Sequence, residues 1–172
     1  MLVGHSHFDH IAGAEVIAAN TRAKIIGSHE SCRVMSEKGI PDSQLLPSSG
    51  GERHRIADGI NVTVFPSIHS CTWILTDAEA GEREHGHTGL TQEERFACPG
   101  LVQRITEFAT SGSPEGAAIM AHVLGAAGSR SDGGSLVFLI ETPDMRIFFQ
   151  DTSGCWTGVL DKIDADVAIL AA

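Results

Sequence analysis

The stretch Gly4-His5-Ser6-His7-Phe8-Asp9-His10 holds the densest group of metal-ligand side chains in this sequence. Three histidines and one aspartate fall within six residues. Imidazole and carboxylate together suit zinc or iron rather than calcium or magnesium. Neighbouring side chains on an extended loop point in different directions, so one tetrahedral ion cannot take all four. The stretch therefore predicts two adjacent metal ions that share one loop.

The residues on either side of this loop predict a strand before it and a helix after it. Residues 1–3 are apolar and indicate the end of a buried strand. Apolar residues at helical spacing predict a helix over 11–19, and a short strand is expected over 23–27. Ser28 is a suitable N-cap for a second helix, which Gly39 is expected to end.

The rest of the chain predicts further strands and one irregular segment. The turn signal Asp58-Gly59 indicates a hairpin of strands 52–56 and 60–65. The segment 72–130 is rich in glycine and charge, which favours an insertion or lid. Within it we expect helices over 91–110 and 114–124. The remaining predicted strands are 135–141, apolar on both faces and so buried on both, its partner 145–150, and 166–170.

Length and composition limit the class of protein. The chain has 172 residues, which fits one domain with a sizeable core. Its net charge is −10 with only 12 lysines and arginines, so we expect no nucleic-acid partner. No apolar run approaches the roughly 18 residues of a membrane span, so we expect no membrane association and a cytoplasmic location. The four cysteines, widely spaced and without a CxxC pair, are expected to be reduced thiols: Cys32, Cys71, Cys98 and Cys155.

Ligand-type residues also follow two of the later strands. His69 comes just after the strand 60–65, and Asp151 comes directly after the strand 145–150. Strand ends along one edge of a sheet converge on a common pocket. We therefore expect six residues to meet in one site: His5, His7, Asp9, His10, His69 and Asp151.

This arrangement resembles the metallo-β-lactamase fold superfamily of metal-dependent hydrolases. The likeness lies in the loop that ends at His10, in Phe65-Pro66-Ser67-Ile68-His69-Ser70, and in Phe148-Phe149-Gln150-Asp151-Thr152-Ser153-Gly154. It covers the chain outside 72–130 and is greatest for the lactonase- and phosphodiesterase-like branches. It implies one α/β domain over 1–172, a four-layer αββα sandwich with a helical lid.

The resemblance also implies roles for the ligand-type residues. His5, His7 and His69 would hold the first metal, and Asp9 and His10 the second, with Asp151 bridging. Two zinc ions are expected, with iron or manganese as alternatives. Asp9 is also the candidate to orient the attacking water. Outside this set, His122 and Arg130 are candidates to anchor an anionic group of the substrate.

The implied reaction is hydrolysis. Metal ions lower the pKa of bound water toward about 7. The resulting hydroxide would attack an ester, lactone or phosphodiester bond of a small molecule.

Two alternatives remain at this point. The superfamily carries leading β-hairpins and a final histidine ligand that this sequence lacks, so we expect an incomplete domain, cut at both ends. One alternative is therefore a catalytically incompetent metal-binding fragment. The other is a redox protein like the diiron members, which typically have a glutamate in the metal loop where this chain reads His7-Phe8-Asp9-His10. The oligomeric state is not predicted.

Overall fold

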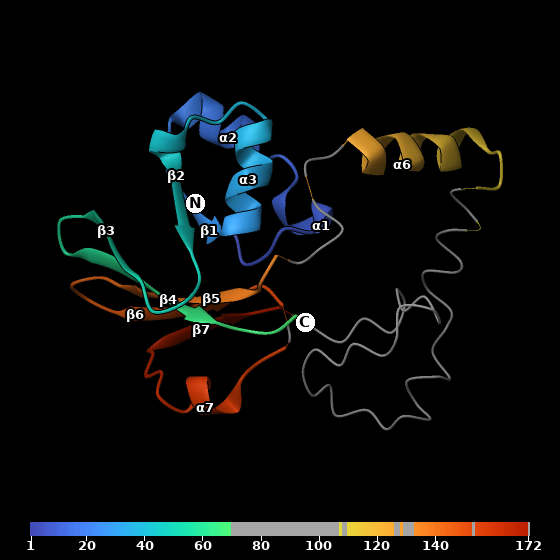
Figure 1. The fold of residues 1–172 in the computed structure, drawn as a ribbon. Helices are drawn as coiled ribbons and strands as arrows, with labels where there is room; N and C mark the ends of the chain where they lie inside the picture. The colour runs from blue at the N-terminus through green and yellow to red at the C-terminus, as the bar shows by residue number, and fades with distance from the viewer. Residues whose placement is uncertain (70–106, 108–109, 126–127, 129–132, 153, 172) are drawn as a thin grey trace, which may run out of the picture.

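A computed structural model describes residues 1–69, 107, 110–125, 128, 133–152 and 154–171 (Figure 1). These residues form a mixed α/β structure with a two-stranded sheet and a five-stranded sheet. Most of the predicted insertion, including nearly all of the helix expected over 91–110, lies outside the described residues. The second helix expected there is confirmed as α6 (Pro114–Gly125).

The N-terminal segment runs beside strand β1 (Ile25–Ser28). The strand expected over 1–3 is reduced to one parallel bridge, between Leu2 and Ile26. The helix expected over 11–19 is confirmed over 14–19 but not as one continuous helix, because the structure has α1 (Phe8–Ile11) and α2 (Ala14–Thr21). Gly13 separates them with a left-handed backbone, φ 85°, a conformation that glycine adopts without steric cost.

Helix α3 (His29–Glu37) follows β1 directly and begins as predicted. The Ser31 amide donates to the Ser28 hydroxyl oxygen at 3.1 Å, which caps the first turn. A short 3₁₀ turn, η1 (Asp42–Gln44), then leads into β2 (Leu45–Ser48), parallel to β1. The sequence pattern does not predict β2, because Pro47 lacks an amide donor and is tolerated only at a sheet edge.

The larger sheet has the order β3-β4-β5-β6-β7. Neighbouring strands are antiparallel except β6 and β7, which are parallel. All five strands were expected, within one or two residues at each end. Their bounds are β3 Arg53–Ala57, β4 Ile60–Pro66, β5 Leu136–Glu141, β6 Arg146–Gln150 and β7 Val167–Leu170.

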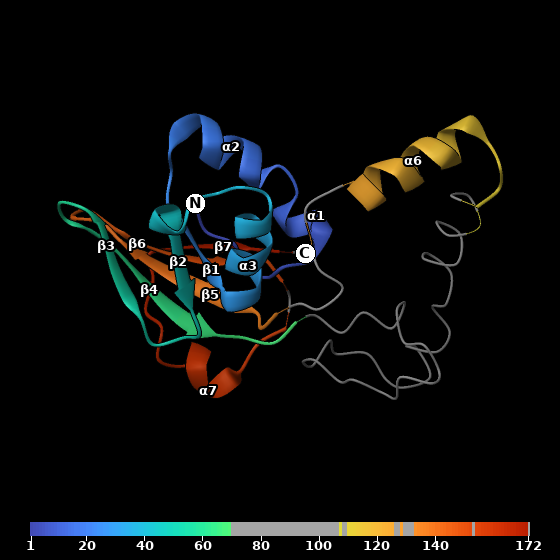
Figure 2. The ribbon, with the colours of Figure 1, turned by 45° about the horizontal axis from the view of Figure 1, so that its top comes forward.

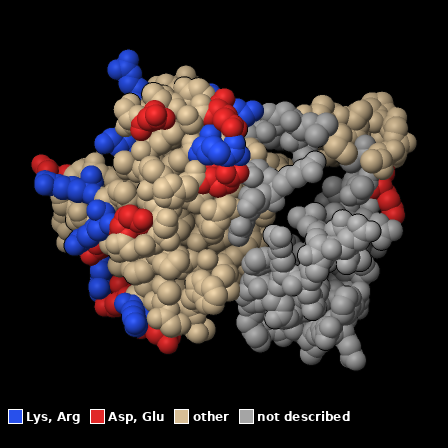
Figure 3. Space-filling model, in the orientation of Figure 1, with Lys and Arg blue, Asp and Glu red and all other residues tan. Residues whose placement is uncertain are grey.

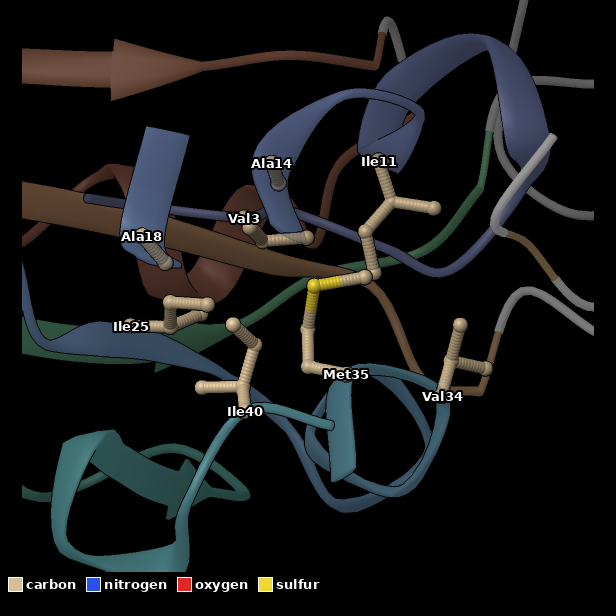
Figure 4. Packing of buried hydrophobic residues seen from close by; sticks show 8 residues of the cluster. All are labelled: Val3, Ile11, Ala14, Ala18, Ile25, Val34, Met35 and Ile40. Atoms are coloured by element: carbon tan, nitrogen blue, oxygen red, sulfur yellow. The ribbon is translucent and has the colours of Figure 1, made fainter. Parts of the chain in front are cut away.

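Two hydrophobic clusters stabilise this arrangement. The first joins the N-terminal segment to α1, α2 and α3, as Figure 4 shows: Val3, Ile11, Ala14, Ala18, Ile25, Val34, Met35 and Ile40. The second lies between β1 and the large sheet: Ile26, Val62, Val64, Leu136 and Phe138. Strand β5 is fully buried only at residues 136–138 and half-buried over 139–141, so the expected burial on both faces holds for its first half.

Figures 1 and 2 show how these elements are layered. The small sheet lies between α2 and α3 on one side and the large sheet on the other. The short helix α7 (Thr157–Leu160), which the sequence pattern does not predict, lies beyond the opposite face of the large sheet. Basic and acidic side chains are intermixed on the face shown in Figure 3. None of the helices in the described ranges combines the length and apolar character that crossing a membrane requires.

Candidate metal centre

One edge of the large sheet brings three separate loops together. Pro66 at the end of β4 pairs with Leu136 at the start of β5. Phe149, near the end of β6, pairs with Phe138. The Leu136 amide also donates to the Gly4 carbonyl oxygen at 2.7 Å. The loop after Gly4, the residues after β4 and the residues after β6 therefore meet at this edge, as expected from the positions of the strand ends.

Three buried or half-buried imidazoles converge there, and we name His5, His7 and His69 the histidine triad. His69 Nε2 is 3.0 Å from His7 Nδ1 and 3.2 Å from His5 Nε2. His5 is completely buried, and His69 is 8% exposed. Ligand nitrogens at about 2.0–2.1 Å from a tetrahedral zinc ion lie about 3.3 Å from one another. The measured separations are close to that value, so the triad can hold one metal ion.

A second group shares His5 with the triad, and we name His5, His10 and Asp151 the carboxylate group. Asp151 Oδ1 is 3.5 Å from His5 Nδ1, and Asp151 Oδ2 is 3.6 Å from His10 Nδ1. Oδ2 also accepts a hydrogen bond from the Gly4 amide at 3.1 Å. His5 Nδ1 and Asp151 Oδ1 are both buried without a hydrogen-bond partner in the structure. Buried polar atoms are rarely left in this state, so a cation or a proton between them fits the chemistry.

His5 presents a different nitrogen to each group. If Nε2 binds a metal ion, the neutral ring carries its proton on Nδ1, which then faces the Asp151 carboxylate. A carboxylate in that position fixes the orientation of a metal-binding histidine. In the other arrangement, Asp151 and His10 hold a second ion themselves. The two arrangements differ by one bound ion, so metal stoichiometry distinguishes them.

The electrostatics of the carboxylate group favour an ionised Asp151. Burial acts to raise the pKa of its carboxyl group, but the imidazoles of His10 and His5, whose nitrogens lie 3.6 and 3.5 Å from its oxygens, outweigh burial and lower the pKa to about 2. The neighbouring Asp151 carboxylate is the main cause that raises the pKa of His10. Asp151 is therefore a carboxylate at neutral pH, the form that a metal ligand requires.

The remaining predicted site residues are not brought into either group. The Asp9 side chain is 60% exposed, and its Oδ2 is 3.5 Å from His10 Nε2. Its expected roles as ligand and as water-orienting residue stay predictions. Arg130 and the side chain of His122 lie outside the described residues, so their expected roles in substrate binding also stay predictions.

Gly4 is a site residue that the sequence reasoning did not single out. A Cβ built on Gly4 would lie less than 3.0 Å from three atoms of the Asp151 carboxyl group, closer than real Cβ atoms come. Only glycine therefore lets the carboxylate reach both the Gly4 amide and the two histidines. The only sequence signal for the role of Gly4 is its position directly before the ligand-type residues that begin at His5.

Two of the four cysteines lie in the described residues, and both are free thiols, as expected. Cys32 is buried in α3, and this burial raises the pKa of its thiol to about 11. Cys155 is half-buried. Neither belongs to a metal-capable group.

Comparison with known proteins finds relatives that are named as hydrolases. No protein-family model matches the chain. The chain is 36% identical over 99 residues to a UPF0173 metal-dependent hydrolase of Pyrobaculum calidifontis and 31% identical to one of Pyrobaculum islandicum. Each alignment covers 54% of this chain and 44% of the relative. A relative named likewise in Myxococcus xanthus is 29% identical over 73 residues, 42% of this chain and 25% of its own length. The chain thus spans less than half the length of these relatives, and its homologues are named metal-dependent hydrolases.

Proposed function

We propose that this protein is a metal-dependent hydrolase of the metallo-β-lactamase type, with its ion held by the histidine triad. The observation that carries the proposal is the convergence of three ring nitrogens at 3.0 and 3.2 Å, one of them from a residue more than sixty positions away. The names of the homologues support the same reaction class. The two sheets, with helices beyond each, are compatible with the αββα sandwich of that superfamily.

Each residue has a distinct part in this proposal. The ion, when bound, supplies Lewis acidity that makes water a nucleophile near neutral pH. The triad holds the ion, and the buried position of His5 keeps one side of it away from solvent. Asp151 and His10 offer the position of a second ion. We propose two ions, zinc in both positions, with iron or manganese as alternatives.

The substrate in this proposal is a small molecule with an ester, lactone or phosphodiester bond. The exposed side of the site carries the side chains of His10, 29% exposed, and Asp9, 60% exposed. In this proposal the substrate reaches the ions from the side of these two residues, and Asp9 accepts a proton or a hydrogen bond. The resemblance to lactonases and phosphodiesterases selects these three bond types.

Metal analysis together with a hydrolysis panel tests the proposal. Purified protein should bind close to two equivalents of metal and hydrolyse a lactone or phosphodiester, and chelation should abolish turnover. His7→Ala should remove most of the metal, and His10→Ala should remove one equivalent. His54→Ala is the matched control, because His54 is a half-buried histidine on β3 that pairs with Ser48.

Three outcomes separate the possibilities. Metal content that is unchanged in His7→Ala would refute the triad as the binding site. One equivalent in wild-type protein would refute the second ion and favour Asp151 as the partner of His5. Normal metal binding without turnover of any substrate would favour the metal-binding fragment over the hydrolase.

A further inference from the structure

The carbonyl oxygen of Gly154 accepts hydrogen bonds from two side chains at once. The Ser67 hydroxyl donates to it at 2.9 Å, and so does the Gln150 side-chain amide, also at 2.9 Å. Ser67 follows β4, and Gln150 is the last residue of β6. Gln150 is 7% exposed, so the hydrogen bond from its side-chain amide to Gly154 is shielded from solvent.

Gly154 also lies directly against the backbone that leads to His69. A Cβ built on Gly154 would lie less than 3.0 Å from the carbonyl oxygens of Ile68 and His69. This is backbone rather than a flexible side chain, so a larger residue cannot be accommodated by a rotamer change. The close approach and the Ser67 hydrogen bond hold the two loops together, and the Gln150 hydrogen bond fixes the position of Gly154 within the loop after β6.

These loops carry one ligand-type residue each. Ser67 precedes His69 by two residues, and Gln150 directly precedes Asp151. His69 belongs to the histidine triad, whereas Asp151 belongs to the carboxylate group. The contact at Gly154 therefore connects the two metal-capable groups through a route other than the shared His5.

We propose that Ser67 and Gln150 are positioning residues, which set the separation of His69 and Asp151 through the Gly154 carbonyl oxygen. We name these three residues the Gly154 clamp. The inference rests on the proposed function for its purpose, since the separation matters for metal binding. Neither side chain touches the ion or the substrate in this proposal.

Outer partners of metal ligands typically change metal affinity about 10–100-fold when they are removed. We expect Ser67→Ala and Gln150→Met to weaken metal binding by about tenfold each, measured by competition with a chromophoric chelator. The double variant should lose little more metal affinity than either single variant. Both hydrogen bonds belong to one connection through the Gly154 carbonyl oxygen, so the loss of either one already breaks it. Ser67→Thr keeps a hydroxyl and should restore most of the affinity.

Ser48→Ala is the control for an ordinary structural serine. The Ser48 hydroxyl is buried and also forms hydrogen bonds, to the Leu46 carbonyl oxygen at 3.3 Å and with His54 Nε2 at 2.9 Å. Its loss should lower the melting temperature of metal-free protein about as much as Ser67→Ala does, while metal affinity stays within about twofold of wild type. A purely structural role for Ser67 would make the two variants indistinguishable in both measurements.

Metal binding by wild-type protein distinguishes a failure of the Gly154 clamp from a failure of the proposed function. Wild-type protein that binds metal normally, with unchanged affinity in Ser67→Ala and Gln150→Met, would overturn the clamp alone. Wild-type protein that binds no metal would overturn the proposed function. In that case, ring-proton NMR shifts of His69 in metal-free protein decide on the clamp, since they should move in Ser67→Ala and stay fixed in Ser48→Ala. Unmoved shifts in Ser67→Ala would overturn it.

Discussion

Replacement of Gly4 by alanine should displace Asp151 without straining the backbone of residue 4. Gly4 has no positive φ, so alanine can adopt the same backbone conformation. Its methyl group, however, would lie less than 3.0 Å from three atoms of the Asp151 carboxyl group. Carbon and oxygen atoms pack without repulsion at about 3.5 Å or more. The carboxylate must therefore move by on the order of 1 Å, and the hydrogen bond from the Gly4 amide is lost or weakened.

A displacement of this size is large for a metal site. Metal–ligand distances hold within about 0.2 Å, and even a partner that only orients a ligand is worth about 10–100-fold in affinity. Asp151, as a proposed ligand of the second ion, should matter at least as much. Gly4→Ala should therefore weaken the metal equivalent that depends on Asp151 by about 10–100-fold, whereas the ion of the histidine triad should stay bound more tightly. Isothermal titration with zinc, read against metal analysis after dialysis, resolves the two equivalents.

The control and the double variant make this test specific. Gly158→Ala adds a methyl group to α7 where nothing lies within 4 Å, so metal affinity should equal that of wild type. In an Asp151→Ala background the Gly4→Ala change should cost little further affinity, because the group that it collides with has been removed. Wild-type affinity in Gly4→Ala, or equal losses with and without Asp151, would refute the reasoning.

Three other predictions follow from the structure. Phe138→Ala, at a side chain with 0% exposure in the second hydrophobic cluster, should destabilise the protein by about 3–5 kcal/mol in urea unfolding; a loss under about 1 kcal/mol would contradict its place in the core. His7→Ala protein incubated with cobalt should lose most of the absorption bands of the wild type, because the proposed triad no longer holds its ion; an unchanged spectrum would remove His7 from the site. In metal-free protein, the pKa of Asp151 is lowered from 3.8 and that of His10 is raised from 6.5. The contribution of Asp151 to the unfolding free energy is fully present above pH 3.8 and is lost as the pH falls toward about 2. The contribution of His10 is fully present below pH 6.5 and is lost as the pH rises above that value. The difference in unfolding free energy between wild type and Asp151→Asn should thus be largest between these limits, and a difference that keeps growing above pH 6.5 would contradict the pairing.

The sequence predicts the strands of the large sheet well because each has a strong local signal. The strands β5 and β6 are apolar runs on either side of a turn at residues 142–145, and antiparallel pairing needs little more. The predicted meeting of the loop after Gly4 with the residues after β4 and β6 follows from the same strands. Their ends occupy one edge once Pro66 pairs with Leu136.

The elements that the sequence misses are those set by tertiary contacts. Strand β2 has four residues and a proline, and it forms because β1 offers a parallel partner. The break between α1 and α2 depends on the left-handed backbone of Gly13, whereas the apolar spacing alone fits a single helix. Gly4 and Gly154 are required by atoms far away in the sequence, namely the Asp151 carboxylate and the carbonyl oxygens of Ile68 and His69. No local pattern contains that information.

Residues at the start of β5 hold the two histidine-bearing loops of the site in place. The Leu136 amide bonds the Gly4 carbonyl oxygen, Leu136 pairs with Pro66, and the Ser67 amide donates to the Ser135 carbonyl oxygen at 2.8 Å. The loop of His5 and His7 and the loop of His69 are thus both attached to two adjacent, buried residues. The triad is therefore only as rigid as the packing of Leu136 in the second hydrophobic cluster. A core change such as Leu136→Ala should consequently weaken metal binding as well as stability, although Leu136 is not a ligand, whereas Phe138→Ala, two residues further along β5, should act mainly on stability.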